Sequence, residues 1–146
     1  MPGFTFHETM SGSYHLDADP MRERAVSFTV TARALSLVRF ASDRVATAEG
    51  EMVLEGIADH RAARGTLVID PILGKRIAYD LRFLGDDGRG YRLAGEKTIR
   101  FLSPMRSMTT LPAELFDDTG KKIGAGRLRF DARNDLVGFV KSFRLR

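Results

Sequence analysis

Cysteine is absent from the 146-residue chain. A protein without cysteine has no disulfide framework, no thiolate zinc site, no cysteine-ligated iron–sulfur cluster and no cysteine nucleophile. The absence is compatible with a reducing compartment, and we expect a cytoplasmic protein.

Long apolar runs are also absent. No segment reaches the roughly 18 consecutive apolar residues that a transmembrane helix needs. The first twenty residues include Glu8, Asp17 and Asp19 and hold no apolar run. The sequence therefore predicts neither a secretory signal nor a membrane span.

Few motifs that carry chemistry occur. The chain has no G-x-S-x-G pattern and no P-loop, and the stretch Gly124–Arg129 lacks the third glycine of a dinucleotide fingerprint. The histidines His7, His15 and His60 show no metal-ligand spacing. The sequence predicts no metal and no cofactor. It favours a non-enzymatic protein and leaves open a reaction in which Glu8 acts as a base.

The length and composition fit one folded domain that spans residues 1–146. Hydrophobic residues make up 43% of the chain and charged residues 29%, close to the globular average. The net charge of +4 comes from the C-terminal part, because residues 121–146 carry eight Lys and Arg against two Asp and Glu. This segment is a solvated face or a contact surface for an acidic partner. No basic helix or aromatic sheet motif points to nucleic acid.

Alternation of apolar and polar residues recurs along most of the chain and is typical of strands with one buried face. It predicts strands over residues 4–11, 26–31, 51–55, 66–70, 77–83, 91–93, 107–116 and 122–130. A charged loop is expected around 59–64. Helical spacing predicts one short helix from Leu35 to Ala41, and residues 136–145 are expected to form a closing strand or a second short helix.

Turn residues connect several of these strands. Asp87-Gly88 lies between two alternating runs, as in a β-hairpin, and residues 117–120 predict a second hairpin. Strands do not alternate with helices, so the sheet is expected to be mainly antiparallel. We predict an all-β fold, a lipocalin-like closed β-barrel of about eight to ten strands with one short helix. A β-sandwich is the alternative.

Polar residues fall on the predicted inner faces of these strands. Glu8, Tyr79, Tyr91 and Lys97 alternate in register with apolar residues. A buried carboxylate and a buried ammonium are each costly alone, so Glu8 and Lys97 are predicted to pair, with a tyrosine hydroxyl as a further partner. Either these groups satisfy one another in a filled core, or they fix the head of an amphipathic ligand. The candidate ligand-binding residues are Glu8, Met10, Phe28, Tyr79, Phe83, Tyr91 and Lys97.

Five segments carry a resemblance to a known module: 6–12, 79–83, 87–97, 109–111 and 124–128. Together they resemble the accessory β module joined to cholesterol-oxidase-like, FAD-dependent oxidoreductases of the glucose–methanol–choline class. In that module Trp and Asp precede the threonine run, where this chain has Arg106-Ser107-Met108. The flavin-binding domain is not in this sequence, so the resemblance implies a stand-alone relative of the accessory module and does not imply oxidase activity.

Two functions follow from these observations. The first is a lipocalin-like binding module for a small lipidic or sterol-like ligand, accessory to an oxidoreductase partner. The alternative is a non-catalytic regulatory or interaction domain that docks on an enzyme. The oligomeric state and the identity of the ligand are left open.

Overall fold

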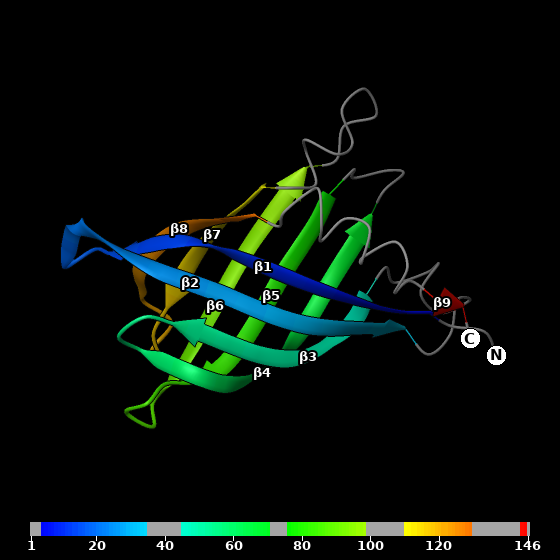
Figure 1. Ribbon diagram of the computed structural model, residues 1–146, viewed down its shortest axis with the longest axis horizontal. Coiled ribbons are helices and arrows are strands. Elements are labelled where there is room, and N and C mark those ends of the chain that lie inside the picture. Colours follow the sequence, from blue (N-terminus) through cyan, green and yellow to red (C-terminus); the bar gives the residue numbers. More distant parts are fainter. Residues whose placement is uncertain (1–3, 35–44, 71–75, 99–109, 130–143, 146) are drawn as a thin grey trace.

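The computed structural model describes residues 4–34, 45–70, 76–98, 110–129 and 144–145. These residues form nine strands (Figure 1). In chain order the strands are β1 (Phe4–Leu16), β2 (Asp19–Ala34), β3 (Val45–Leu54), β4 (Ala58–Asp70), β5 (Arg76–Leu84), β6 (Gly90–Thr98), β7 (Thr110–Phe116), β8 (Lys122–Arg129) and β9 (Arg144–Leu145).

The strands close into a single antiparallel barrel. Each strand from β1 to β8 pairs with the next, and β1 pairs with both β2 and β8, which completes the ring. The two-residue β9 adds to β1. Closure removes the free edges of the sheet, and it confirms the barrel rather than the sandwich. The helix expected from Leu35 to Ala41 lies outside the described residues, as does most of the segment 136–145.

The alternation that predicted the strands also separates their two faces. In β2, Val26, Phe28 and Val30 are buried while Ala25 and Thr29 are exposed. The predicted inward positions Leu54, Leu67, Leu81, Phe83 and Leu93 are buried as well. The side chains of Phe4, Phe6, Ile69 and Ile99 lie outside the described part of the structure. The inner faces therefore form one continuous apolar core.

Both predicted hairpins are present, and they share one turn geometry. In the β5–β6 turn the Gly88 N–H donates to the Gly85 carbonyl at 3.0 Å, and Gly88 has a φ of 82°. In the β7–β8 turn the Gly120 N–H donates to the Asp117 carbonyl at 3.1 Å, and Gly120 has a φ of 86°. A left-handed residue at this point of a short hairpin favours glycine.

One expected loop is wrong. Residues 59–64 belong to strand β4, which pairs with β3 through Gly50↔Ala63 and Glu51↔Ala62. The inner face of this strand is built from small residues, including Ala58, Ala63 and Gly65. Small residues give only a weak hydrophobic alternation, and the charged residues on the outer face made the segment resemble a loop in the sequence.

Candidate functional site

The centre of the barrel contains a buried polar pair. The Tyr79 hydroxyl on β5 donates a hydrogen bond of 2.6 Å to Oε1 of Glu8 on β1. Glu8 is 7% exposed and Tyr79 3%. Strands β1 and β5 are not neighbours in the sheet, so this bond crosses the interior. The predicted tyrosine partner of Glu8 is therefore confirmed, whereas the side chain of Lys97 is outside the described residues.

An aromatic side chain fills the same level of the barrel. Phe28 lies in register with Met10 on β1 and with Met52 on β3. Its ring centroid is 5.8 Å from that of Tyr79 on β5, with the ring planes tilted by 57°. Neither methionine has exposed surface. Side chains from opposite walls thus meet here, and the central interior is packed.

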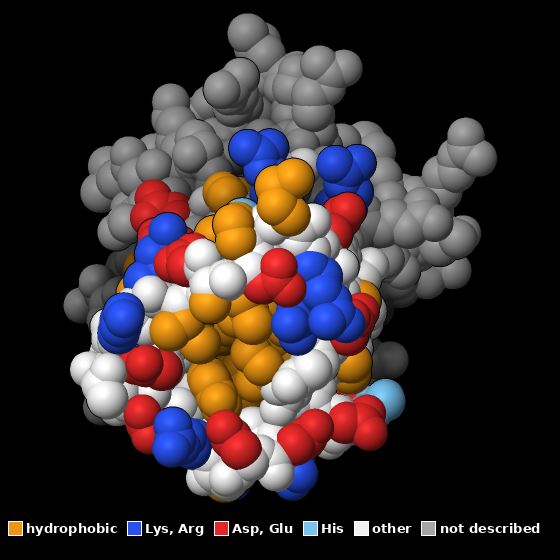
Figure 2. All heavy atoms as spheres, turned by 90° about the vertical axis from the view of Figure 1, so that its left-hand side faces the viewer, with side chains coloured by type: hydrophobic (Ala, Val, Ile, Leu, Met, Phe, Trp, Pro, Cys, Tyr) orange, Lys and Arg blue, Asp and Glu red, His pale blue; other side chains and the backbone are white. Residues whose placement is uncertain are grey.

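The hairpin end of the barrel is more open than its centre. Four half-buried apolar residues pack against the core there: Leu16, Ile57, Tyr91 and Ile123. Figure 2 looks onto this end and shows hydrophobic side chains in a hollow, with charged side chains around it. We call these four residues together with Phe83 the hairpin-end hollow.

Tyr91 and Phe83 form an aromatic wall of the hollow. They are cross-strand partners, and their rings stack with centroids 5.9 Å apart and planes 20° from parallel. The Tyr91 hydroxyl donates to Oδ2 of Asp87 at 2.8 Å. Burial and this carboxylate raise the pKa of Tyr91 to about 12. The hydroxyl is thus held by the β5–β6 turn while the ring contributes apolar surface.

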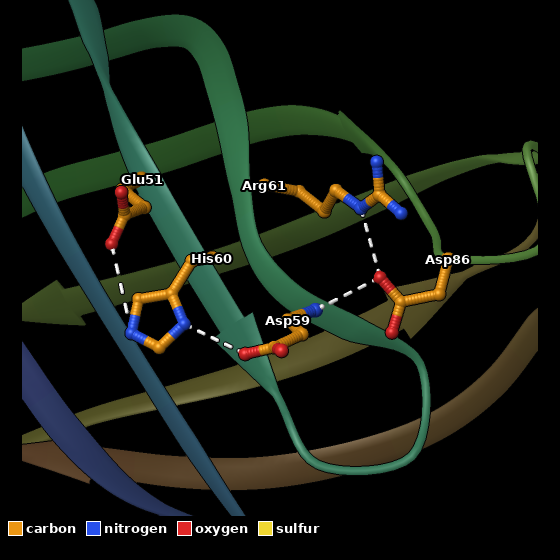
Figure 3. Close-up of polar contacts among 5 residues, drawn as sticks. All are labelled: Glu51, Asp59, His60, Arg61 and Asp86. Carbon is orange, nitrogen blue, oxygen red and sulfur yellow. Dashed lines mark hydrogen bonds and ion pairs between the residues drawn. The ribbon is translucent and has the colours of Figure 1, made fainter.

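A polar network joins two of the hairpins at the rim (Figure 3). Oδ1 of Asp86 accepts hydrogen bonds from Nε of Arg61 at 2.8 Å and from the Asp59 backbone N–H at 3.1 Å. These two donors lower the pKa of Asp86. The Asp86 N–H in turn donates to the Ile57 carbonyl at 2.7 Å. The network fixes the β3–β4 turn, which carries Ile57, beside the β5–β6 turn.

His60 belongs to the same surface. It is exposed, and its Nδ1 lies 2.7 Å from Oδ1 of Asp59. That hydrogen bond and the charge of Glu51 raise the pKa of His60. The residues that the structure describes include no group of His, Cys, Asp and Glu that could hold a metal ion. Within the same ranges no helix could cross a membrane.

Six of the seven predicted binding residues divide into two groups. The structure places Glu8, Met10, Phe28 and Tyr79 in the packed centre, and Phe83 and Tyr91 at the hairpin end. Lys97 lies on β6 opposite Ile77, whose side chain is buried. The sequence reasoning missed three residues of the hollow, namely Leu16, Ile57 and Ile123. For Ile57 the sequence did offer a signal, because an apolar residue that directly follows a turn glycine, as in Gly56-Ile57, could have been predicted to pack at the end of the barrel.

Replacing Tyr79 by phenylalanine should change the response of stability to alkaline pH. Burial, with the charge of Glu8 second, raises the pKa of Tyr79 well above its usual value. The folded protein therefore keeps this proton above pH of about 10, where an unfolded tyrosine loses it. Stability from this group is complete below that pH and falls by about 1.4 kcal/mol per pH unit above it.

We expect Tyr79→Phe to lower the free energy of unfolding by about 1–3 kcal/mol at neutral pH, because Glu8 loses a buried hydrogen bond. The difference from the wild type should shrink between pH of about 10 and 12. Urea unfolding monitored by circular dichroism at several pH values measures both effects. If the free energy of unfolding fell in parallel with rising pH for the two proteins, the raised pKa of Tyr79 would be contradicted.

Comparisons with known proteins bear on the fold. No protein-family model and no curated protein matches the sequence. The chain is similar to a solved structure described as a redesigned β-barrel, mFAP1, bound to DFHBI, with a TM-score of 0.50 and 10% sequence identity. The match covers 84% of this chain and 93% of that one. This likeness supports the barrel fold.

Proposed function

We propose that this chain is a lipocalin-like binding module for a small lipidic or sterol-like ligand. The observation that carries the proposal is the hairpin-end hollow, an apolar surface at one end of a closed barrel with charged residues around it (Figure 2). A concave apolar surface with a polar rim suits a molecule with an apolar body and a polar end. The mouth of a β-barrel is a common place for such a site.

The proposed site continues inward along β5 from Phe83 to Tyr79. These residues share one face and are four residues apart, about 13 Å in a strand. Leu81 between them has no exposed surface, so a ligand that enters this far must displace side chains. Met10 and Met52 suit that role, because methionine is unbranched and adapts its shape at low cost.

The resemblance to the oxidoreductase accessory module supports an accessory role in lipid or sterol chemistry. In this proposal the barrel holds the apolar molecule, and the oxidoreductase is a separate partner. The redesigned barrel mFAP1 was solved with DFHBI bound, which shows that a barrel of related fold accommodates a ligand.

One observation favours the second function, a domain that docks on an enzyme without holding a ligand. The Phe28–Tyr79 and Glu8–Tyr79 contacts fill the centre of the barrel. A barrel of eight strands is just wide enough to be filled by side chains. A docking domain requires only such a filled barrel and an outer contact surface.

Native mass spectrometry of the purified protein, followed by titration with fluorescent fatty-acid and sterol probes, separates the two functions. The binding module predicts a co-purifying apolar molecule or saturable one-to-one binding of a probe at micromolar concentration. Failure of both tests would favour the docking domain.

Lys97→Met should weaken the binding of an acidic probe more than that of a neutral one. Lys97 pairs with Ile77, two residues beyond the Tyr79↔Gly95 pair as counted from the hairpin end, so we propose that a fatty acid enters with its carboxylate first and that the Lys97 ammonium attracts it. A charge-assisted bond of this kind contributes about 1.5–3 kcal/mol. The fatty acid should therefore bind about tenfold more weakly to the variant. The corresponding fatty alcohol should bind almost unchanged. Equal weakening of both probes would contradict a role in head-group recognition.

A further inference from the structure

Three arginines form a row on the outer surface of the barrel. Arg64 on β4 lies directly opposite Arg82 on β5, and Arg82 lies directly opposite Arg92 on β6. Like charges in directly opposed positions destabilise a sheet. Glu49 on β3 lies directly opposite Arg64 at one end of the row, so Arg82, which has an arginine opposite it on both sides, carries the least compensated charge.

Only one arginine of the row has an acidic partner among the residues that the structure describes. Nε of Arg92 donates to Oδ1 of Asp80 at 2.9 Å, and its guanidinium lies 5.0 Å from the centroid of the Phe116 ring. Arg64 and Arg82 are exposed, and neither side chain makes a hydrogen bond or an ion pair within the described ranges. Two neighbouring guanidinium groups thus keep their donors available.

These arginines line a groove of about 950 Å³ along β3 to β6, which Phe83 and Tyr91 also line. The β7–β8 turn closes one side of it, and Leu84, which is 58% exposed, adds apolar surface. The acidic lining residues lie at the two margins, Glu49 on β3 and Asp117 with Asp118 in the turn. Oδ1 of Asp117 already accepts hydrogen bonds from the N–H groups of Thr119 and Lys121.

We propose that this groove binds a small molecule that carries a phosphate group on an apolar body. Arginines on adjacent strands stand about 5 Å apart, so two guanidinium groups can donate to one tetrahedral oxyanion. Arginine is well suited to phosphate because its donors form a planar fork. The groove is large enough to hold a whole small molecule, and Leu84 offers contact to its apolar part.

The groove adjoins the hairpin-end hollow, because Phe83 and Tyr91 line both. The arginines, however, lie on the outer face of the barrel, whereas the hollow residues pack against the core. The two tests are kept apart because Arg82 is not part of the hollow and Ile57 does not line the groove.

Isothermal titration with phenyl phosphate and with inorganic phosphate tests this site in the full chain. We expect saturable one-to-one binding of phenyl phosphate, several-fold tighter than inorganic phosphate because of the apolar contact. Arg82→Gln should weaken phenyl phosphate at least about tenfold, the effect of losing one charge-assisted contact. Arg129→Gln is the matched control, since Arg129 is exposed on β8 and does not line the groove.

The melting temperature provides a second measurement. Arg82→Gln should melt at the same temperature as the wild type or higher, because it removes a charge from a like-charged row. A lower melting temperature would assign Arg82 a structural role and overturn the proposal. The proposal would also be overturned if Arg129→Gln weakened phenyl phosphate binding as much as Arg82→Gln does, or if phenyl phosphate showed no saturable binding. A third contrary result would be Arg82-dependent binding of polyglutamate or anionic vesicles without any binding of phenyl phosphate.

Discussion

Replacing Phe28 by alanine should lower the free energy of unfolding by about 3–5 kcal/mol. The Phe28 side chain is 2% exposed, lies between Met10 and Met52, and contacts the Tyr79 ring across the barrel. The substitution removes these contacts and leaves a cavity where the opposite walls now meet. Urea unfolding monitored by circular dichroism measures the loss.

Met21→Ala is the matched control for this substitution. Met21 also lies on β2, but it is 94% exposed, so its truncation should change stability by less than about 0.5 kcal/mol. A loss of less than about 1.5 kcal/mol for Phe28→Ala would mean that Phe28 already borders a void. That result would contradict the packed centre described above.

Replacing Gly65 by alanine should destabilise the barrel by about 3 kcal/mol or more. A Cβ atom at this position would lie 1.7 Å from the Asp80 carbonyl oxygen and 3.0 Å from Cα of Leu81. Both atoms belong to the backbone of β5, which cannot move aside as a flexible side chain can. A glycine within a strand permits such a close approach of a neighbouring backbone.

Gly88→Ala separates this steric effect from the general cost of replacing a glycine. Gly88 has a φ of 82°, and a Cβ there would meet no atom within 4 Å. Its replacement by alanine should lower the free energy of unfolding by only about 1–2 kcal/mol, which is the cost of a left-handed backbone at a residue with a side chain. Thermal unfolding of the two variants side by side measures the difference. Equal losses would show that the close approach of β4 and β5 relaxes easily.

The sequence predicted the barrel because most strands carry a strong alternation. The runs Val26-Phe28-Val30 and Tyr79-Leu81-Phe83 have large apolar residues at every second position, and each faces the core. The turn glycines Gly88 and Gly120 marked two hairpins for a local reason, their left-handed backbone. Strand β4 was in part missed, because its inward Ala63 and Gly65 give little hydrophobic signal.

The candidate site was harder to predict, because it depends on where side chains meet across the barrel. The alternation of apolar and polar residues placed Glu8 and Tyr79 on inner faces, and they do form a hydrogen bond. The same alternation grouped Tyr91 with them, yet the Tyr91 hydroxyl bonds to Asp87 in the adjoining turn. The hollow includes Leu16 and Ile57, which lie in different hairpins at the same end of the barrel, so their common location depends on how the barrel closes.

If the proposed apolar ligand enters the barrel through the hairpin-end hollow, a large side chain placed there should block it. Ile57→Trp places a large ring in the hollow, and Leu84→Trp places the same ring on the outer face, where Leu84 is 58% exposed. Both variants and the wild type are titrated with a fluorescent fatty acid and a fluorescent sterol. We expect saturable binding to the wild type and to Leu84→Trp, and at least about tenfold weaker binding to Ile57→Trp. Binding to Ile57→Trp as tight as to the wild type would contradict this route of entry.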